Sequence, residues 1–144
     1  MSNRRFLVMM AIAAALAGCT TPKERHLQDG YRLLSAEEIR ALHQNQTHEV
    51  ELASGKSAVA FFTADGRSTF RRSDGVADQG GWEVRGQNIC YVYPSIPATS
   101  HNCFSVAVKD GNYVLFKEYF DTKGDFGAQV INIIPGNVQG LPLD

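Results

Sequence analysis

Four histidines are the residues of this chain best suited to general acid or base chemistry near neutral pH. They stand at positions 26, 43, 48 and 101. His26 precedes the folded part and His43 falls on a predicted helix, so neither is aimed at a nucleophile. His48 and His101 could meet only through tertiary folding. Because catalysis also needs a nucleophile and a group that stabilises charge, we expect these histidines at the surface, and no catalytic residue.

The carboxylates are also not spaced as a catalytic or metal site. Asp65, Asp74 and Asp110 each precede a glycine, a pattern typical of turns. Asp74 follows a pair of arginines, which favours a surface ion pair over a substrate clamp. Residues 121–125 are rich in oxygen atoms but lack the ligand spacing of a calcium loop. We therefore expect no enzymatic activity, no cofactor and no metal.

Cys19 is the cysteine whose chemistry the sequence indicates most clearly. Residues 1–5 contain two arginines and no acid, and residues 6–16 are an unbroken apolar run. That run is about half the ~20 residues that a membrane-spanning helix needs, so it is typical of a signal peptide. It ends in Leu-Ala-Gly-Cys, which resembles the lipobox of bacterial lipoproteins. The resemblance predicts a signal peptide over 1–18 and a diacylglyceryl group on the Cys19 thiol.

A lipid on Cys19 would anchor the protein to a membrane without a transmembrane helix. Thr20 follows the cysteine, where an aspartate commonly retains lipoproteins of Gram-negative bacteria at the inner membrane. In such a host we expect the outer membrane, facing the periplasm. The alternative is an ordinary secretory signal with a chance cysteine. Residues 19–30 are polar and contain Pro22 and Gly30, which predicts a spacer between lipid and domain.

A short helix is predicted at the start of the folded domain. Ser35 and Glu38 have the spacing of a capping box, and Leu34 and Ile39 occupy the two positions of a hydrophobic staple. The helix should run from residue 36 to about 44. At this length it cannot persist alone and must pack against other elements.

The rest of the chain alternates between apolar and polar residues and has glycine turns. Residues 57–63 and 67–72 flank Asp-Gly, a two-residue hairpin signal that places Phe61 opposite Phe70. Further strand patterns lie at 82–85, 88–93, 102–108, 113–120 and 129–134. Phe104, Val106 and Val108 should point inward. About eight short strands predict a mainly β fold: an antiparallel meander curled into a barrel or half-barrel, with the helix over one end or edge. Residues 31–144 would form this single domain.

Cys90 and Cys103 fit one antiparallel register. If they are opposite each other, so are Ile89 and Phe104, because opposed residues have a constant index sum. An exported compartment is oxidising, so we expect a disulfide. Two free buried thiols are the alternative. A metal site is disfavoured because His101 supplies only one further ligand.

These motifs together resemble a family of small exported proteobacterial proteins known as a domain of unknown function. The similarity covers residues 34–113 and rests on Leu-Ser-Ala-x-Glu-Ile at 34–39, Phe-x-x-Asp-Gly at 62–66, Gly-Trp-x-Val-x-Gly at 81–86, Cys90, Cys103, Val106 and Asp-Gly-x-Tyr at 110–113. The resemblance implies a β-rich fold and no particular activity or substrate.

Two features favour binding over catalysis. The loop over 94–100 contains Pro94, Ile96 and Pro97 and would be held at its base by the disulfide, as recognition loops often are held on a scaffold. Consecutive aromatic residues such as Phe61-Phe62 and Tyr119-Phe120 cannot all face one side of a sheet. The extra rings need either a second covering layer or an exposed patch for a partner.

The charge balance narrows the class of partner. Fourteen basic against fifteen acidic residues do not form the positive surface of a nucleic-acid-binding protein. We predict a non-enzymatic binding or interaction module, anchored through Cys19, whose partner is an envelope protein, a cell-wall glycan or a small apolar ligand. The alternative is an inhibitor of an exported protease or lysozyme that inserts the 94–100 loop into a cleft.

Overall fold

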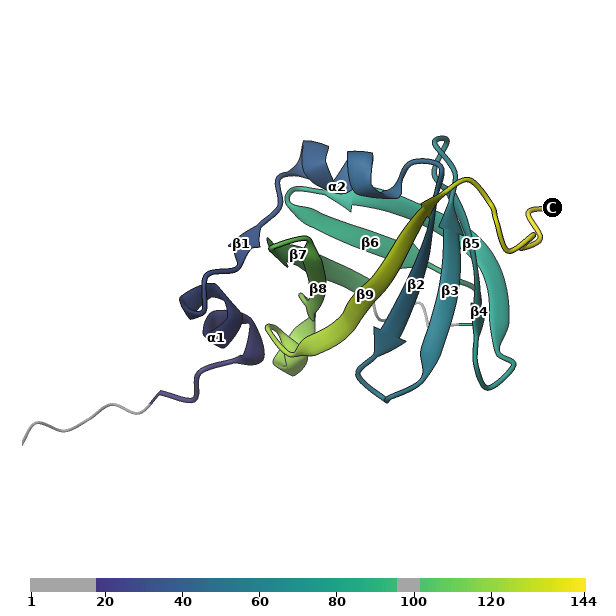
Figure 1. Cartoon of the computed structure of the whole chain (residues 1–144). Coiled ribbons are helices and arrows are strands. Elements are labelled where there is room, and N and C mark those ends of the chain that lie inside the picture. Colours follow the sequence, from purple (N-terminus) through teal and green to yellow (C-terminus); the bar gives the residue numbers. More distant parts are fainter. Residues whose placement is uncertain (1–17, 96–101) are drawn as a thin grey trace, which may run out of the picture.

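The structure, a computed structural model, describes residues 18–95 and 102–144, apart from the side chain of Phe120. Strands dominate it, and two short α-helices lie near its N-terminal side (Figure 1). The elements in chain order are α1 (Pro22–Gln28), β1 (Arg32–Leu33), α2 (Ala36–His43), β2 (Gln46–Leu52), β3 (Ser57–Phe62), β4 (Arg67–Arg72), β5 (Ala77–Arg85), β6 (Asn88–Val92), β7 (Asn102–Lys109), β8 (Asn112–Lys117), a 3₁₀ turn (Phe120–Thr122) and β9 (Phe126–Pro135). The predicted mainly β fold is confirmed.

Strands β2 to β9 form a closed antiparallel barrel of eight strands. Each strand pairs with the next along the chain, and β9 returns to pair with β2. Along that closing seam Gln46 lies opposite Pro135 and Leu52 opposite Ala128. Closure pairs both sides of every strand in the ring, which removes the free sheet edges that invite aggregation. The predicted meander is thus a full barrel.

Helix α2 lies across one end of the barrel (Figure 1). It begins with the predicted capping box: the Glu38 backbone N–H donates to the Ser35 hydroxyl, and the Ser35 N–H donates to the Glu38 carboxylate. Ile39 is fully buried in the barrel interior. Asn45 takes a left-handed conformation (φ 56°) and turns the chain into β2. The predicted helix and its place at one end are confirmed.

The β3–β4 hairpin differs from the predicted register by one residue. Phe61 lies opposite Thr69, and Ala60 lies opposite Phe70. The reason is the turn: the Thr63 N–H donates to the Arg67 carbonyl over 2.9 Å, so three residues and not two form the loop. Phe61 and Phe70 therefore lie on opposite faces of the barrel wall.

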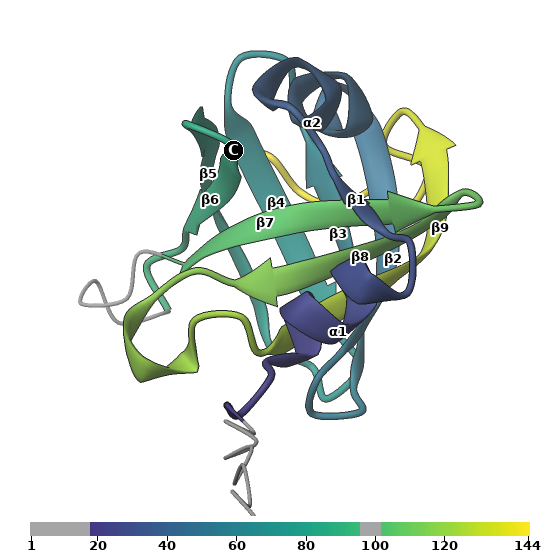
Figure 2. The same ribbon diagram turned by 90° about the vertical axis from the view of Figure 1, so that its left-hand side faces the viewer.

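The predicted spacer contains a helix, so that expectation is wrong over residues 22–28. Thr21 and Glu24 form a second capping box, with Pro22 at the first helical position. The helix is held on the outside of the barrel near β8: the Lys23 N–H donates to the Gly124 carbonyl over 3.0 Å, and the His26 ring lies 5.0 Å from the Phe116 ring (Figure 2). A seven-residue helix persists here because it packs.

Apolar side chains form two clusters, one inside the barrel and one outside. The inner cluster holds Val106, with Phe104 and Val108 packed against it, as the alternation predicts. The outer cluster lies between β7–β8 and the N-terminal segment and contains Ala107, Val114, Phe116, Tyr31, Leu33 and Phe126. The N-terminal segment therefore provides a second layer over one side of the barrel.

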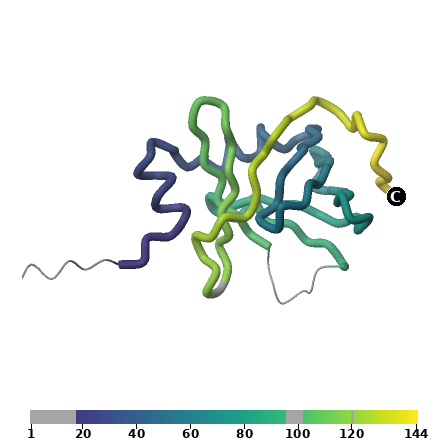
Figure 3. The backbone as a smooth tube through the Cα atoms, turned by 60° about the horizontal axis from the view of Figure 1, so that its bottom comes forward, coloured from purple at the N-terminus to yellow at the C-terminus, as the bar shows by residue number. Residues whose placement is uncertain are grey.

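The C-terminal segment is tied to another part of the barrel surface, on the side away from α1 (Figure 3). Leu141 is buried, and two hydrogen bonds join its backbone to the Asn137 amide. The Asp144 N–H also donates to the Gln79 side chain on β5 over 2.8 Å. Outward-facing Phe61 and Phe116 are both buried, so neither belongs to an exposed aromatic patch.

Candidate functional site

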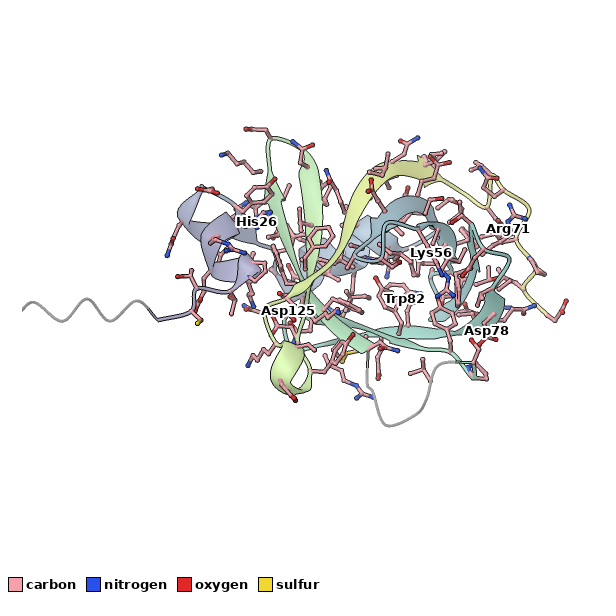
Figure 4. The ribbon with its side chains drawn as sticks, turned by 90° about the horizontal axis from the view of Figure 1, so that it is seen from below. His26, Lys56, Arg71, Asp78, Trp82 and Asp125 are labelled. Carbon is pink, nitrogen blue, oxygen red and sulfur yellow. A yellow bond between two sulfur atoms is a disulfide. The ribbon has the colours of Figure 1, made fainter. Side chains whose placement is uncertain are left out.

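The barrel interior is filled unevenly along its length. Strand β2 starts beside α2 and runs away from it, so inward-facing His48, Val50 and Leu52 lie progressively farther from the helix (Figure 1). Next to α2 the interior holds large buried side chains, among them Ile39, Trp82 and Ile89. Figure 4 looks into the barrel from the end opposite α2, with Trp82 inside the ring of strands.

Toward that opposite end the inward positions carry small residues. Ala58 and Ala60 are alternate residues of β3, and Gly127 and Ala128 are the second and third residues of β9. They line a partly open cavity of about 230 Å³. A single water needs only ~10–15 Å³ by this kind of measure, and sites for drug-sized molecules begin at ~300 Å³. The cavity is thus of a size for one small molecule.

The cavity wall is mostly apolar, with few polar side chains. Aliphatic and aromatic residues from β2, β3, β4, β7, β8 and β9 provide most of it. The polar exceptions are His48, Arg72, Tyr91, Tyr93 and Asn102. An apolar hollow with a few separate polar groups is the usual form of a small-molecule binding site.

Among the described residues of the wall Arg72 is the only cation, and it is paired with the Asp74 carboxylate. Its Nε and one terminal nitrogen each lie 2.8 Å from a carboxylate oxygen of Asp74, and Lys56 also donates to Asp74 over 2.8 Å. The hydrogen bonds from Arg72 and then Lys56 hold the pKa of the Asp74 carboxyl well below its usual range. The predicted ion pair beside the two arginines is confirmed.

His43 and His48 lie side by side in the interior, and the prediction that they lie at the surface is wrong. His43 is fully buried, His48 is 3% exposed, and the two ring centroids are 4.6 Å apart. Helix α2 carries His43 over the barrel end onto Trp82, whose ring is 5.6 Å away. Burial is the main cause that lowers the pKa of His43 to about 3 and that of His48 to about 4, so both rings are neutral at pH 7.

Hydrogen bonds fix the tautomers of these two rings differently. Nδ1 of His43 lies 2.8 Å from the Ile39 carbonyl, so it carries the proton; Nε2 lies 3.1 Å from the Tyr91 hydroxyl and accepts from it. In His48 the protonated nitrogen is Nε2, which lies 2.8 Å from the Leu42 carbonyl. His43 therefore has both nitrogens bonded, whereas the Nδ1 of His48 is a proton acceptor.

Two tyrosines line the wall beside β6: Tyr91 lies on the strand, and Tyr93 follows its last residue. Burial raises the pKa of the Tyr91 hydroxyl far above its usual range, and it raises that of Tyr93 to about 12. Both hydroxyls therefore stay protonated. Because the histidines are neutral as well, His48, Tyr91 and Tyr93 give the cavity an uncharged polar side.

The predicted disulfide is confirmed and supports this wall. Cys90 and Cys103 are opposite each other on β6 and β7 and are bonded, with Ile89 opposite Phe104 as predicted. Cys90 is buried and immediately precedes Tyr91. The bond thus joins the strands that carry Tyr91 and Asn102, and Tyr93 follows directly after β6.

The predicted recognition loop is only partly described. Pro94 is exposed, and the backbone N–H of the next residue, Ser95, donates to the Asp78 carboxylate over 2.6 Å, which ties the start of the loop to β5. Ile96 and Pro97 lie outside the described residues. Cys19 is described, exposed and unpaired.

Two features of metal-binding and membrane-spanning proteins are absent from residues 18–95 and 102–144. No group of three or more histidine, cysteine or acidic side chains there is close enough to hold a metal ion. No helix within those ranges is long and apolar enough to cross a membrane.

The sequence predicted a recognition loop at 94–100 but not the cavity inside the barrel. The sequence signal of the cavity is faint: alanines at alternate inward positions 58 and 60, and Gly-Ala at 127–128. Neither known family models nor curated proteins match this sequence, so the resemblances to lipoproteins and to the domain of unknown function stay predictions.

Proposed function

We propose that this protein is a lipid-anchored binding module whose barrel takes up one small, largely apolar molecule without transforming it. The observation that carries the proposal is the partly open, apolar cavity of about 230 Å³ inside the barrel. Of the partners that the sequence left open, a small apolar ligand is the one that this cavity fits. A protein or glycan partner would need a surface instead.

The energetics favour a site over a packing defect. An unfilled dry cavity costs ~24 cal/mol per Å³, so a volume of about 230 Å³ costs up to about 5.5 kcal/mol, less whatever water recovers by entering through the opening. That is comparable with the whole stability of a small domain. Larger side chains at Ala58 and Ala60 would remove the cost without changing the strand pattern. A barrel optimised for stability alone would fill this space.

The polar groups support binding and not catalysis. Both nitrogens of His43 are engaged, and Arg72 is bridged to Asp74. Nucleophilic catalysis needs a nucleophile within reach of a base. Tyr91 is the hydroxyl bonded to a histidine, but burial raises its pKa far above neutrality and disfavours the nucleophilic phenolate.

The proposed anchor would hold the barrel close to the membrane. Only Thr20 separates Cys19 from Thr21, the N-cap of α1, and α1 is docked on the outer wall near β8. Very little free chain would therefore lie between a lipid on Cys19 and the barrel. A barrel held at this position would encounter molecules that partition into the bilayer. Such molecules are largely apolar.

Binding can be tested with the purified mature protein and the uncharged apolar dye N-phenyl-1-naphthylamine. The chain has one tryptophan, Trp82, which lies in the interior cluster and should report occupancy. We expect saturable binding with one dye per chain. The variant Ala60→Leu places an isobutyl group in the cavity and should weaken dye binding strongly. Equal affinity of the wild type and this variant would place the dye elsewhere and contradict the proposal.

The anchor can be tested separately in cells. Cys19→Ser should leave the domain folded and move it from the membrane fraction to the soluble fraction, because no thiol remains for acylation. Retention of the variant in the membrane fraction, at the wild-type level, would contradict a lipid anchor on Cys19 and leave the cavity proposal standing.

A further inference from the structure

One acceptor on the cavity wall, on a largely buried side chain, has no donor among the described residues. His48 is 3% exposed and lines the cavity. Its Nε2–H donates to the Leu42 carbonyl over 2.8 Å, so Nδ1 has a lone pair and no proton. Within the described ranges no residue donates to Nδ1. Among the described residues Ser68 Oγ is the only fully enclosed side-chain polar atom without a partner, so Nδ1 of His48 is an unpartnered acceptor that is open to the cavity.

The Leu42 bond is what determines this state of the ring. The Leu42 carbonyl belongs to the last turn of α2, where carbonyl groups have no partner within the helix. His48 supplies that partner from the start of β2. The ring is also held by its neighbours, with the His43 and Phe62 ring centroids at 4.6 and 5.0 Å. The acceptor is thus fixed in both tautomer and position.

His43 makes the contrast clear because it has the same side chain in the same cluster. Both of its nitrogens have partners, the Ile39 carbonyl and the Tyr91 hydroxyl. The Tyr91 proton is used in that bond, so it does not serve His48. What distinguishes His48 is its place on the cavity wall.

The strand opposite His48 leaves space beside the ring. His48 is paired with Ala60 on β3, and Ala60 is paired with Phe70 on β4. Directly opposed side chains start ~4.5–5.5 Å apart, so a large residue at position 60 would cover His48. Alanine leaves this flank of the ring open to the cavity.

We infer that the ligand carries an uncharged hydrogen-bond donor, such as a hydroxyl, at its inner end and that Nδ1 of His48 accepts this hydrogen bond. The inference rests on the proposed function and adds the ligand's chemical class: a small apolar alcohol or phenol. An ionised carboxylate at this position would place its oxygen, which is an acceptor, against the Nδ1 lone pair of His48, so no hydrogen bond could form. The low pKa of His48 agrees with this selection, because a neutral ring offers a lone pair and no second proton.

The test uses the mature protein and three probes of one ring system: 2-naphthol, naphthalene and 2-naphthoate. We expect 2-naphthol to bind about fivefold more tightly than naphthalene, the worth of one net hydrogen bond, and 2-naphthoate to bind most weakly. In His48→Phe the preference for naphthol over naphthalene should disappear. The control His26→Phe lies outside the barrel on α1 and should keep it.

A second measurement does not depend on the variant folding. In wild-type protein with ¹⁵N-labelled histidine, 2-naphthol should shift the Nδ1 resonance of His48 in the direction of hydrogen-bond acceptance, and naphthalene should not. If naphthol and naphthalene bind equally, or the naphthoate binds best, the inference is wrong while the cavity proposal stands. If none of the three binds, both are wrong.

Discussion

The two ends of the barrel interior differ in how completely side chains fill them. At the end covered by α2, large side chains fill the space, and the buried His43 has a partner for each nitrogen. At the other end alanine and glycine face inward and a cavity remains, and His48, where the cavity approaches α2, keeps an acceptor without a donor. The difference suggests that the closed end provides stability and that the open end gives up part of it for a site.

Acidification should have the largest effect, through the histidine pair. In the unfolded chain each imidazole takes up a proton near pH 6.5, whereas in the folded protein the pKa values of His43 and His48 are about 3 and about 4. The unfolded state therefore gains protons first, and stability that is complete above pH 6.5 is lost as the pH falls below it. From pH 7 to 5 we expect the free energy of unfolding to fall by about 4 kcal/mol, measured by urea denaturation.

The control for this pH effect is His48→Gln, which keeps a donor for the Leu42 carbonyl but does not titrate. It should show about half the wild-type pH dependence. Acids such as Glu38, whose pKa is about 2, contribute only below their unfolded values, outside this range. A wild-type stability that does not change between pH 7 and 5 would mean that the histidines are not buried.

Truncation of one inward-facing side chain at each end should lower the free energy of unfolding by different amounts. Ile39→Ala removes a fully buried side chain from the closed end, and such changes cost roughly 2–5 kcal/mol. Leu52→Ala lies on the partly open cavity wall, where water already has access, and should cost about 1 kcal/mol or less. Denaturant unfolding of both variants gives the comparison. Equal losses would contradict the difference in packing.

Loss of the disulfide should weaken the barrel as a whole. The bond joins Cys90 and Cys103, 13 residues apart, and in the chain-entropy model a loop of this size contributes about 3 kcal/mol. The double variant Cys90→Ala, Cys103→Ala should lose about that much in thermal or chemical unfolding. Dye binding should weaken too, because the bond fixes the strands that carry Tyr91 and Tyr93. Wild-type stability in the double variant would show that sheet pairing alone holds these strands.

Local signals in the sequence predicted the strands, α2 and the disulfide. The alternation at 102–108 and the capping box at Ser35 depend on neighbouring residues, and the cysteine register needs only an index sum. The same local rule could have found α1, since Thr21 and Glu24 also form a capping box. Pro22 was taken as a mark of a spacer, although proline is favoured at the first helical position.

The features that the sequence did not predict depend on contacts between distant parts of the chain. The hairpin register shifted because Thr63 closes a three-residue loop around an Asp-Gly pair that also suits a two-residue turn. The buried histidines depend on α2 turning over the barrel, and closure depends on β9 meeting β2, some 80 residues away. The cavity depends on all of these contacts together. An alanine at position 60 does not by itself indicate whether neighbouring side chains fill the space beside it.

The smallest expected effect on stability is also the sharpest test of the comparison. Ala60→Leu adds three carbon atoms where the cavity can receive them, so the free energy of unfolding should change by less than about 1 kcal/mol. The matched control is Ala107→Leu, at a fully buried alanine in the filled cluster outside the barrel, where overpacking costs about 1–3 kcal/mol. Both substitutions are the same chemical change on a β-strand, so intrinsic strand preference cancels between them. If Ala60→Leu were as destabilising as Ala107→Leu, the space beside His48 would be too small for even an isobutyl group, and no ligand could reach its Nδ1.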